Sequence, residues 1–393
     1  MAILFSFSPW ADIGNDQPAY KLARLMDKCL WFENENGGLG IPISWAMSGQ
    51  TMEAICRVDP SIAGSIRVRT LNKGVFTSWD QSEIIGSTFH ASSLVQPCLD
   101  DHYQEAYING FVKEDIKHTN EVMWKLFERS PKGFCPSEKV FSIQCSRSVV
   151  EEGYEYCIIG GESFGSDFHA QNNKGGVFQL ENGLKVLPTV NEILPNDFHK
   201  YHKAELLIDE IINYCRRNHI GRVVLSADVD FWLEGDDWET AVENGFNRIK
   251  WMYLKCKERE NEIRMVNTHA LIESSWQQGY SGLNSLIRFY ESIGIPDPYR
   301  FISSWTNPKG NLDFVDWSRS DKAAQFIKAH TDKYLRGINH QQWVDGDKLQ
   351  SSKQMWLNIS GTVFYDDRPE WRDFMTDCFN ENLEKAWNLL NDS

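Results

Sequence analysis

Short β-rich runs alternate with amphipathic stretches from the start of the chain to about residue 265, and this alternation limits the fold more than any other feature. Such an order of segments is typical of parallel strands covered by helices. We therefore expect an α/β fold. Its expected elements are strands at 3–7, 41–45, 83–87, 140–144 and 222–227, and helices at 19–32, 197–218 and 238–260.

Residues 176–188 interrupt this pattern. Two apolar runs, 177–180 and 184–187, are joined by Glu181, Asn182 and Gly183. An Asn-Gly pair accommodates the positive φ values of a type I′ turn, so the stretch predicts a β-hairpin. We expect this hairpin to be an excursion from the α/β domain.

The character of the sequence changes after residue 265. Longer amphipathic segments follow, at 271–293, 322–335 and 371–390, and the loops between them are rich in Trp, Gly and Pro. A chain of 393 residues is also near the size at which one core stops growing. We expect two domains, an α/β domain at 1–265 and a mostly helical domain at 266–393.

The charge balance excludes one large class of partner. The chain has 55 acidic and 40 basic residues, a formal net charge of −15, which repels the phosphate backbone of nucleic acids. It also has no uninterrupted run of about 20 apolar residues, the length that a membrane-spanning helix needs. We therefore expect neither a nucleic acid nor a membrane as a partner.

The cysteines and histidines give little support for a metal or a disulfide framework. The nine cysteines are scattered and form no Cys-x-x-Cys pair, which favours a reducing, cytoplasmic setting. Asp197, His199 and His202 resemble half of a metal site. A helical i, i+3 pair of histidines usually lies on a solvated face, so we expect no metal and no cofactor.

Two segments place a carboxylate next to a strand-like run. Glu138 ends the stretch 132–138, in which a Gly and a Pro shape a tight turn just before the apolar run at 140–144. Asp228 and Asp230 follow the apolar run at 223–227. In parallel barrels the residues that do chemistry gather at strand ends. A solvated turn at Glu138 and a helix cap at Asp228 explain the same placements, so spacing alone leaves both interpretations open.

A pair of carboxylates at different strand ends is sufficient to cleave a glycosidic bond. One attacks the anomeric carbon while the other protonates the departing oxygen. Aromatic residues make up 13% of the chain, including 15 Trp, and their flat apolar faces suit sugar rings as well as large interfaces. Glu138 and Asp228 fit this chemistry if the fold brings them together.

Four segments resemble motifs of glycoside hydrolase family 57. Residues 133–138 (Gly-Phe-Cys-Pro-Ser-Glu) resemble the family's Gly-x-Trp-x-x-Glu, with Cys135 in place of the Trp. Residues 227–232 (Ala-Asp-Val-Asp-Phe-Trp) resemble its Asp-x-Glu-Phe/Leu-Phe. Residues 82–90 resemble the strand and loop that line its donor-sugar subsite, and residues 302–310 its Ser-Trp-Gly segment. The four segments occur in the family's order.

Two motifs depart from the family. Its first strand carries His-x-His-x-Pro, where this chain has Phe5 and Phe7 in place of the histidines. Phenyl rings there would leave sugar hydroxyls unpaired, at about 1 to 3 kcal/mol for each buried group. The Gly-His-Trp-Trp that follows the acid/base is also missing at 231–235. We therefore expect either a sugar other than the family's starch-like substrates or a loss of activity.

The resemblance implies an incomplete (β/α)7 barrel, of the glycoside hydrolase and deacetylase type, with a C-terminal mostly helical domain over its mouth. It implies a retaining glycoside hydrolase or transglycosylase that acts on an α-linked carbohydrate without a metal. Glu138 would be the nucleophile and Asp228 the acid/base, about 5 to 5.5 Å apart. The candidate sugar-binding residues are Trp10, Thr88, His90, Trp232 and Trp305.

Two other functions stay open. One is a carbohydrate-binding relative that has lost catalysis, for which the missing first-strand histidines argue. The other is a metal-dependent polysaccharide deacetylase, for which the Asp197, His199 and His202 group argues.

Overall fold

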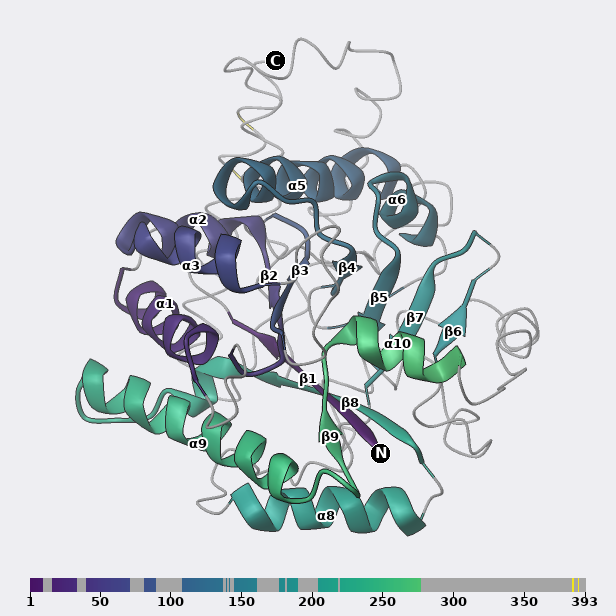
Figure 1. The fold of residues 1–393 in the computed structure, drawn as a ribbon. Helices are drawn as coiled ribbons and strands as arrows, with labels where there is room; N and C mark the ends of the chain where they lie inside the picture. The colour runs from purple at the N-terminus through teal and green to yellow at the C-terminus, as the bar shows by residue number, and fades with distance from the viewer. Residues whose placement is uncertain are drawn as a thin grey trace.

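A computed structural model describes most of the first 276 residues. The described residues are 1–9, 16–33, 40–70, 81–89, 108–136, 139, 141, 145–160, 177–180, 182–189, 204–217, 220–276, 384 and 388. The domain expected at 266–393 therefore lies, beyond residue 276, almost wholly outside the described residues. Within them the chain forms one sheet with helices packed around it (Figure 1).

The sheet is parallel over most of its width. Its order is β6-β7-β5-β4-β3-β2-β1-β8, and β9 also pairs with β1. Each neighbouring pair from β7 to β8 is parallel, so seven strands form the incomplete (β/α)7 barrel that the sequence predicts. The strands are β1 (Ala2–Ser8), β2 (Ile43–Met47), β3 (Glu83–Gly86), β4 (Gly133–Phe134), β5 (Tyr156–Ile159), β6 (Phe178–Gln179), β7 (Lys185–Pro188), β8 (Arg222–Asp228) and β9 (Arg264–Met265).

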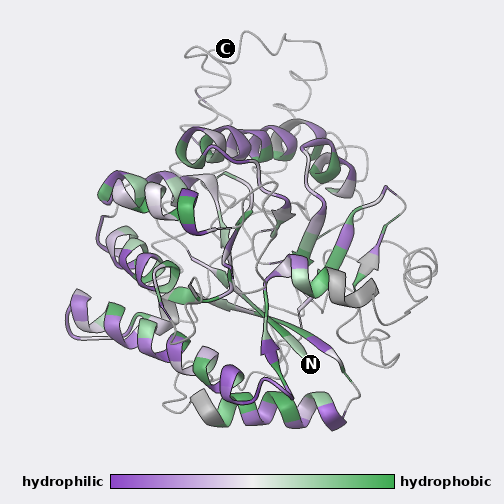
Figure 2. Ribbon diagram, in the orientation of Figure 1, coloured by the Kyte–Doolittle hydropathy of each residue, from purple (hydrophilic) through white to green (hydrophobic). Residues whose placement is uncertain are grey.

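Most of the helices cover the outer face of this sheet, with their apolar sides turned toward it (Figure 2). Two of them begin with a side-chain cap: the Ser48 hydroxyl accepts from the Thr51 N–H at 3.1 Å, and Asp237 accepts from the Thr240 N–H at 2.8 Å. The helices are α1 (Asp16–Leu30), α2 (Gly49–Val58), α3 (Ser61–Arg69), α5 (Lys113–Phe127), α6 (Cys145–Glu151), α8 (Ala204–Arg217), α9 (Trp238–Glu258) and α10 (Thr268–Trp276), with single turns η1 (Ile108–Val112) and η6 (Val229–Trp232).

The two faces of the sheet carry different sets of side chains, because successive residues of a strand point to opposite sides. On β1, Ile3, Phe5 and Phe7 belong to the large buried cluster that joins the sheet to α1, α2, α8 and α9, which we call the outer core. Leu4 belongs to a second cluster, which we call the inner cluster. Its strand members are Leu4, Ala46, Ile85, Tyr156, Ile158, Leu187 and Val224.

Helix α10 differs from the other helices because it packs into the inner cluster. Ala270, Leu271 and Ile272 lie there with residues from β1, β2, β3, β5, β7 and β8. Strand β9 leads to this helix and pairs with the first residues of β1. The packing of the barrel therefore extends past residue 265, where the sequence places the end of the α/β domain, and includes α10.

The hairpin near 176–188 is present, but its second strand is not an excursion. Strands β6 and β7 are antiparallel, while β7 pairs in parallel with β5 and so ends the barrel sheet. The turn also differs from type I′, because Gly183 (φ +89°) has a positive φ and Asn182 does not. The Leu180 carbonyl accepts from the Gly183 N–H at 2.9 Å, which fits a tight turn followed by a glycine bulge.

The strand expected at 140–144 lies mostly outside the described residues and stays a prediction. Phe141 is the one described residue of that run and belongs to no strand, and α6 begins at Cys145. The barrel strand of this region is β4, which precedes Glu138. The strands expected near 3–7, 41–45, 83–87 and 222–227 and the helices expected at 19–32, 197–218 and 238–260 are confirmed, with shifted ends.

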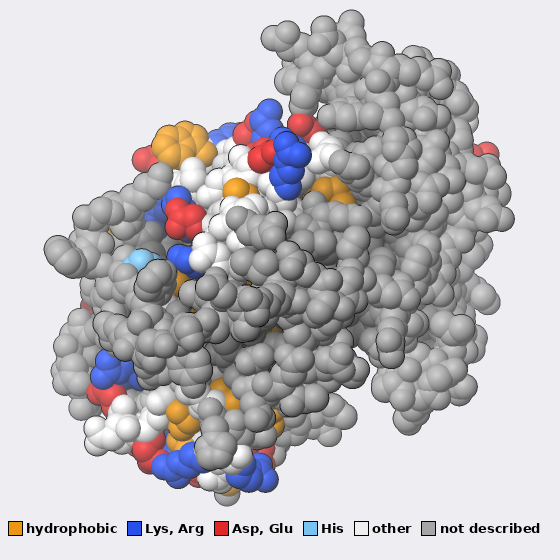
Figure 3. Space-filling view, turned by 90° about the vertical axis from the view of Figure 1, so that its right-hand side faces the viewer, with side chains coloured by type: hydrophobic (Ala, Val, Ile, Leu, Met, Phe, Trp, Pro, Cys, Tyr) orange, Lys and Arg blue, Asp and Glu red, His pale blue; other side chains and the backbone are white. Residues whose placement is uncertain are grey.

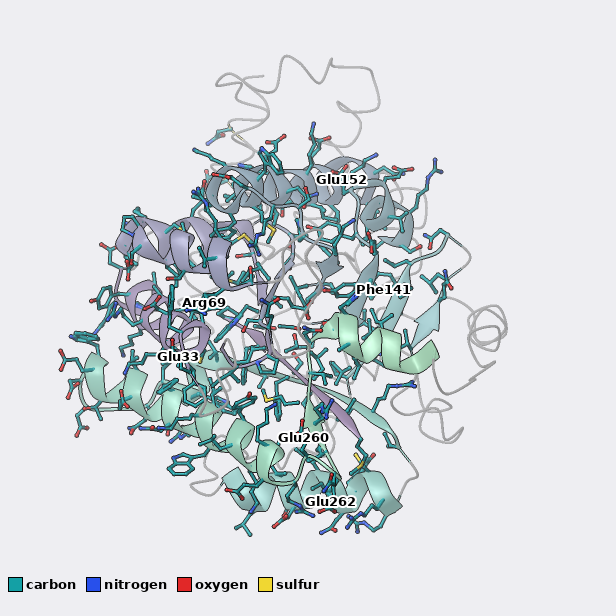
Figure 4. The ribbon with its side chains drawn as sticks, in the orientation of Figure 1. Glu33, Arg69, Phe141, Glu152, Glu260 and Glu262 are labelled. Atoms are coloured by element: carbon teal, nitrogen blue, oxygen red, sulfur yellow. The ribbon has the colours of Figure 1, made fainter. Side chains whose placement is uncertain are left out.

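Polar contacts fix the first residue of the chain beside the turn that follows α9. The Met1 ammonium donates to the Glu262 carbonyl at 2.7 Å, and the Glu262 carboxylate pairs with Arg259 at 2.9 Å and with Arg216. Glu260 pairs with Arg264 at 2.9 Å. Figure 4 shows Glu260 and Glu262 together near α8, below β9. The start of β1 is thus tied to the segment that leads into β9.

The described surface mixes both signs of charge. Figure 3 shows Lys and Arg side chains beside Asp and Glu side chains on the described part of one face. Glu151, for example, pairs with Lys113 at 2.7 Å and with Arg147 at 2.8 Å. On this described part of the surface, acidic and basic side chains therefore neutralise one another in pairs.

Candidate active site

The carboxyl ends of the seven parallel strands meet at one edge of the barrel, where the chemistry of parallel barrels is concentrated. Asp228 is the last residue of β8 and pairs with Ser8, the last residue of β1. Glu138 follows Phe134, the last residue of β4, by four positions. The backbone of β8 therefore places Asp228 at this edge, and β4 also ends there. The Glu138 residue and the Asp228 side chain, and with them the distance between the carboxyl groups, lie outside the described residues.

A row of polar residues crosses four strands two residues before Asp228. Ser226 on β8 pairs with Ser6 on β1, Ser6 pairs with Ser44 on β2, and Ser44 pairs with Glu83 on β3. All four are buried, with Ser6 and Ser44 at 0% exposure and Glu83 at 5%. A step of two residues along a strand is about 6.6 Å, so this row runs just below the strand-end level of Asp228.

Glu83 accepts four hydrogen bonds inside the barrel. The Tyr156 hydroxyl donates to Oε2 at 2.8 Å, and the Thr268 N–H donates to Oε1 at 2.8 Å. The hydroxyls of Ser44 and Thr268 also donate to Oε1. No cation is among these partners, so the carboxylate is satisfied by neutral donors from β2, β5 and α10.

Tyr156 joins this cluster to the strand that precedes Glu138. A Cβ on Gly133 of β4 would lie 2.2 to 2.5 Å from the Tyr156 ring atoms, so the ring occupies the space that a side chain would need. Burial, and then the neighbouring Glu83 carboxylate, raise the pKa of Tyr156 well above its ordinary value. Tyr156 is therefore a neutral hydrogen-bond donor, and the Gly of the 133–138 motif has a packing reason.

The aromatic residues at the positions of the family's histidines do not face the inner side of the barrel. Phe5 and Phe7 lie in the outer core, at 2% and 0% exposure. The expectation that they stand against the sugar is wrong, because the alternation of β1 turns Leu4 and Ser6 inward instead. Trp232 is also in the outer core, 2% exposed, with its ring against Phe7. Its described contacts are those of a packing residue.

Of the remaining candidate sugar-binding residues, the structure describes only Thr88. Thr88 lies two residues beyond β3, at the strand-end edge, and is fully buried. Trp10, His90 and Trp305 lie outside the described residues, as do Asp197, His199 and His202. In the part that is described, no three His, Cys, Asp or Glu side chains are grouped as a metal would require.

Seven cysteines are described, and all are buried thiols: Cys29, Cys56, Cys135, Cys145, Cys157, Cys215 and Cys256. Burial raises the pKa of Cys56 and of Cys256 to about 12 and that of Cys215 to about 11. These thiols are therefore protonated near neutral pH. A protonated buried thiol is a poor nucleophile, so these three pack rather than react.

Three residues of the inner face, Glu83, Tyr156 and Thr268, are not among the site residues predicted from the sequence. A signal for the first was present, since Glu83 is a single charge within an otherwise apolar strand, and a buried charge requires partners. Tyr156 and Thr268 come from segments whose contacts with Glu83 depend on the fold, 73 and 185 residues further along the chain. No sequence spacing connects them.

The described strands form a parallel, incomplete β/α barrel, a fold whose chemistry gathers at the carboxyl ends of the strands, where Asp228 lies. The model of glycosyl hydrolase family 57 matches residues 22–280, about two thirds of the chain. The chain belongs to glycosyl hydrolase family 57. A comparison with curated protein sequences found no match. No described helix is both long and apolar enough to cross a bilayer.

Solved structures of that family share the fold. 4-α-glucanotransferase from Thermococcus litoralis matches with a TM-score of 0.61 at 14% identity, over 98% of this chain and 59% of its own. α-Amylase AmyC from Thermotoga maritima matches with a TM-score of 0.59 at 10% identity, over 99% of this chain and 93% of its own. A branching enzyme from Thermococcus kodakaraensis matches with a TM-score of 0.50 at 13% identity, over 99% of this chain and 87% of its own. This chain thus spans 59% of the length of the glucanotransferase.

Proposed function

We propose that this protein is a retaining glycoside hydrolase or transglycosylase that acts on α-linked glucans. The observation that carries the proposal is the family match over residues 22–280, which includes both candidate acids. The solved relatives are a glucanotransferase, an amylase and a branching enzyme, all of which act on α-glucans. The strand-end positions of Asp228 and of the segment that carries Glu138 support the same chemistry.

The proposed reaction has two displacements. In the first, a Glu138 carboxylate oxygen bonds to the anomeric carbon while Asp228 gives its proton to the departing glycosidic oxygen. In the second, the Asp228 carboxylate takes a proton from a water or from a sugar hydroxyl, whose oxygen replaces Glu138 at the anomeric carbon. Water gives hydrolysis and a sugar hydroxyl gives transfer, and both keep the anomeric configuration.

A fluorinated α-glycosyl inactivator tests this proposal directly, because it slows the second displacement and lets the covalent intermediate accumulate. Peptide mass spectrometry should then find the sugar on the peptide that contains Glu138. The variant Glu138→Gln should lose the adduct and turnover and keep glucan binding. Glu121→Gln, at an exposed position of α5, is the matched control and should keep both. Full turnover by Glu138→Gln would refute the assignment.

A non-catalytic sugar-binding protein is the second candidate. The observation that favours it is that β1 turns Leu4 and Ser6 toward the inner side, so these positions offer no imidazole to a sugar. Glucan binding by the wild-type chain, with no adduct from any fluorinated glycosyl donor and no turnover, would favour this candidate over the enzyme.

A further inference from the structure

We propose that Glu83 is a positioning residue of the barrel, which holds both the N-terminus of α10 and the ring of Tyr156 in place on the inner face. Through these two contacts it would fix α10 against the inner cluster and set the course of β4, the strand that leads to Glu138. Glu83 does not act on substrate in this proposal.

The first support is the depth and the completeness of the Glu83 contacts. Its side chain is 5% exposed, and donors from three different elements converge on its two oxygens. A buried carboxylate without a cation is costly unless hydrogen bonds replace its water. These hydrogen bonds tie β2, β5 and α10 to one carboxylate.

The second support is the position of α10. Thr268 is the first residue of this helix and offers both its N–H and its hydroxyl to Glu83. The partial positive charge of a helix N-terminus favours a carboxylate at that place. Asn267 caps the same end by accepting from the Ala270 N–H at 2.9 Å, and it donates to the Gln81 carbonyl at 3.2 Å. The start of α10 is thus bound to the barrel wall next to β3.

The third support is the contact of Tyr156 with β4. The hydroxyl of Tyr156 is held by Glu83, and its ring fills the space above Gly133. Strand β4 has only two residues, so it has few ladder hydrogen bonds of its own. A displacement of the Tyr156 ring would therefore shift the backbone of β4, the strand that precedes Glu138.

The chain provides a matched control in Tyr154. This tyrosine is also buried, at 2% exposure, and its ring fills the space above a glycine of the barrel, Gly86. Its hydroxyl donates to the Asn120 amide oxygen of α5 at 2.7 Å, on the helix side of the sheet. Tyr154→Phe and Tyr156→Phe each remove one buried hydroxyl, and only the second removes a bond to Glu83.

Hydrogen exchange followed by mass spectrometry of the full chain tests the proposal without requiring activity. Glu83→Gln and Tyr156→Phe should raise the exchange rate of amides in 268–272 and 133–136 by about tenfold or more, because a hydrogen bond to a charged group is lost. Tyr154→Phe should leave both segments within about twofold of wild type. Equal exchange in all three variants would overturn the proposal.

A second pair of variants covers the case in which Glu83→Gln fails to fold. Thr268→Val removes one hydroxyl donor to Glu83, and Thr268→Ser keeps it. Exchange in 268–272 should rise in the Val variant and return toward wild type in the Ser variant. A rise in the Ser variant with none in the Val variant would show that only the methyl contact matters, and would count against Glu83.

The kinetic consequence rests on the proposed function. Tyr156→Phe should lower kcat and leave KM nearly unchanged, while Tyr154→Phe should change neither. The two proposals fail in different ways. If wild type forms no adduct on Glu138, the proposed function fails while the exchange result still stands. If the adduct forms and Tyr156→Phe changes neither exchange nor kcat, the positioning role fails alone.

Discussion

The ring of Phe7 meets the edge of the Trp232 ring in the outer core, with centroids 5.0 Å apart. Phe7 also contacts Trp45 at 5.9 Å, so the three rings join β1, β2 and η6 behind the sheet. The residue that replaces a family histidine is therefore part of the packing between sheet and helices. A histidine at this position would enter that packing and not a sugar pocket.

Phe7→His should reduce stability by about 2 to 4 kcal/mol, because a polar ring replaces buried apolar volume. Burial lowers the pKa of such an imidazole, so the loss should grow as the pH falls through the unfolded-state value of about 6.5. Urea unfolding at pH 8 and pH 6 measures both effects, with Phe7→Leu as the control that does not titrate.

The same variant should gain no amylose turnover. Reducing-sugar assays on amylose check this, with the wild-type chain measured in parallel. A gain of turnover in Phe7→His would show that position 7 does reach the sugar.

Gly133→Ala should destabilise the barrel by about 1 to 3 kcal/mol, the range for overpacking, because its Cβ would meet the Tyr156 ring at 2.2 Å. Gly64→Ala is the matched control, since nothing lies within 4 Å of its Cβ on α3. There the change should stabilise by about 0.5 to 1 kcal/mol through helix propensity. Thermal unfolding of both variants measures the two changes in stability. A Gly133→Ala variant as stable as wild type would contradict the predicted clash with Tyr156.

The cap of α9 should make stability depend on pH in the acid range. The Thr240 N–H holds the pKa of Asp237 below its ordinary value of 3.8. A carboxyl with a lower pKa in the folded state stabilises that state above the unfolded pKa, and this stability is lost as the pH falls through the folded pKa. Asp237→Asn keeps the cap without the charge.

The advantage of wild type over Asp237→Asn should therefore be present at about pH 6 and smaller at about pH 3, below the unfolded-state pKa. Urea unfolding of both proteins at the two values measures it. An advantage that grew on acidification would have the opposite sign and would contradict the assigned cause.

Iodoacetamide should not modify Cys56, Cys215 or Cys256 in the native protein at pH 8. Their pKa values, raised to about 11 or 12 by burial, keep the reactive thiolate scarce, and the surrounding core blocks access. Peptide mass spectrometry before and after urea treatment measures this, and all three should be labelled after unfolding. Rapid native labelling of Cys256 would show that α9 opens.

The order of strands and helices could be predicted from the sequence because long periodic segments carry a clear signal, as at 19–32 and 238–260. Strand β4 could not, since two residues have no periodicity. The face of β1 on which Phe5 and Phe7 lie could not be predicted either, for another reason. Both sides of β1 are buried, so its apolar pattern does not say which side faces the helices.

The candidate site was predictable only as separate segments. The sequence places Asp228 at a strand end, and the structure has it as the last residue of β8. The Glu83 cluster depends on Ser44, Tyr156 and Thr268, which only the folded barrel brings together. Contacts of such long sequence separation leave no trace in local patterns.

The pairing of β1 with β8 and β9 has a consequence for biosynthesis. This strand is made before the other described strands, and its partners in β8 and β9 leave the ribosome more than 200 residues after it. Until then the nascent chain exposes an apolar strand edge, which is a site for aggregation and for chaperones. The barrel must therefore be completed late in synthesis, by insertion of its final strands beside its first.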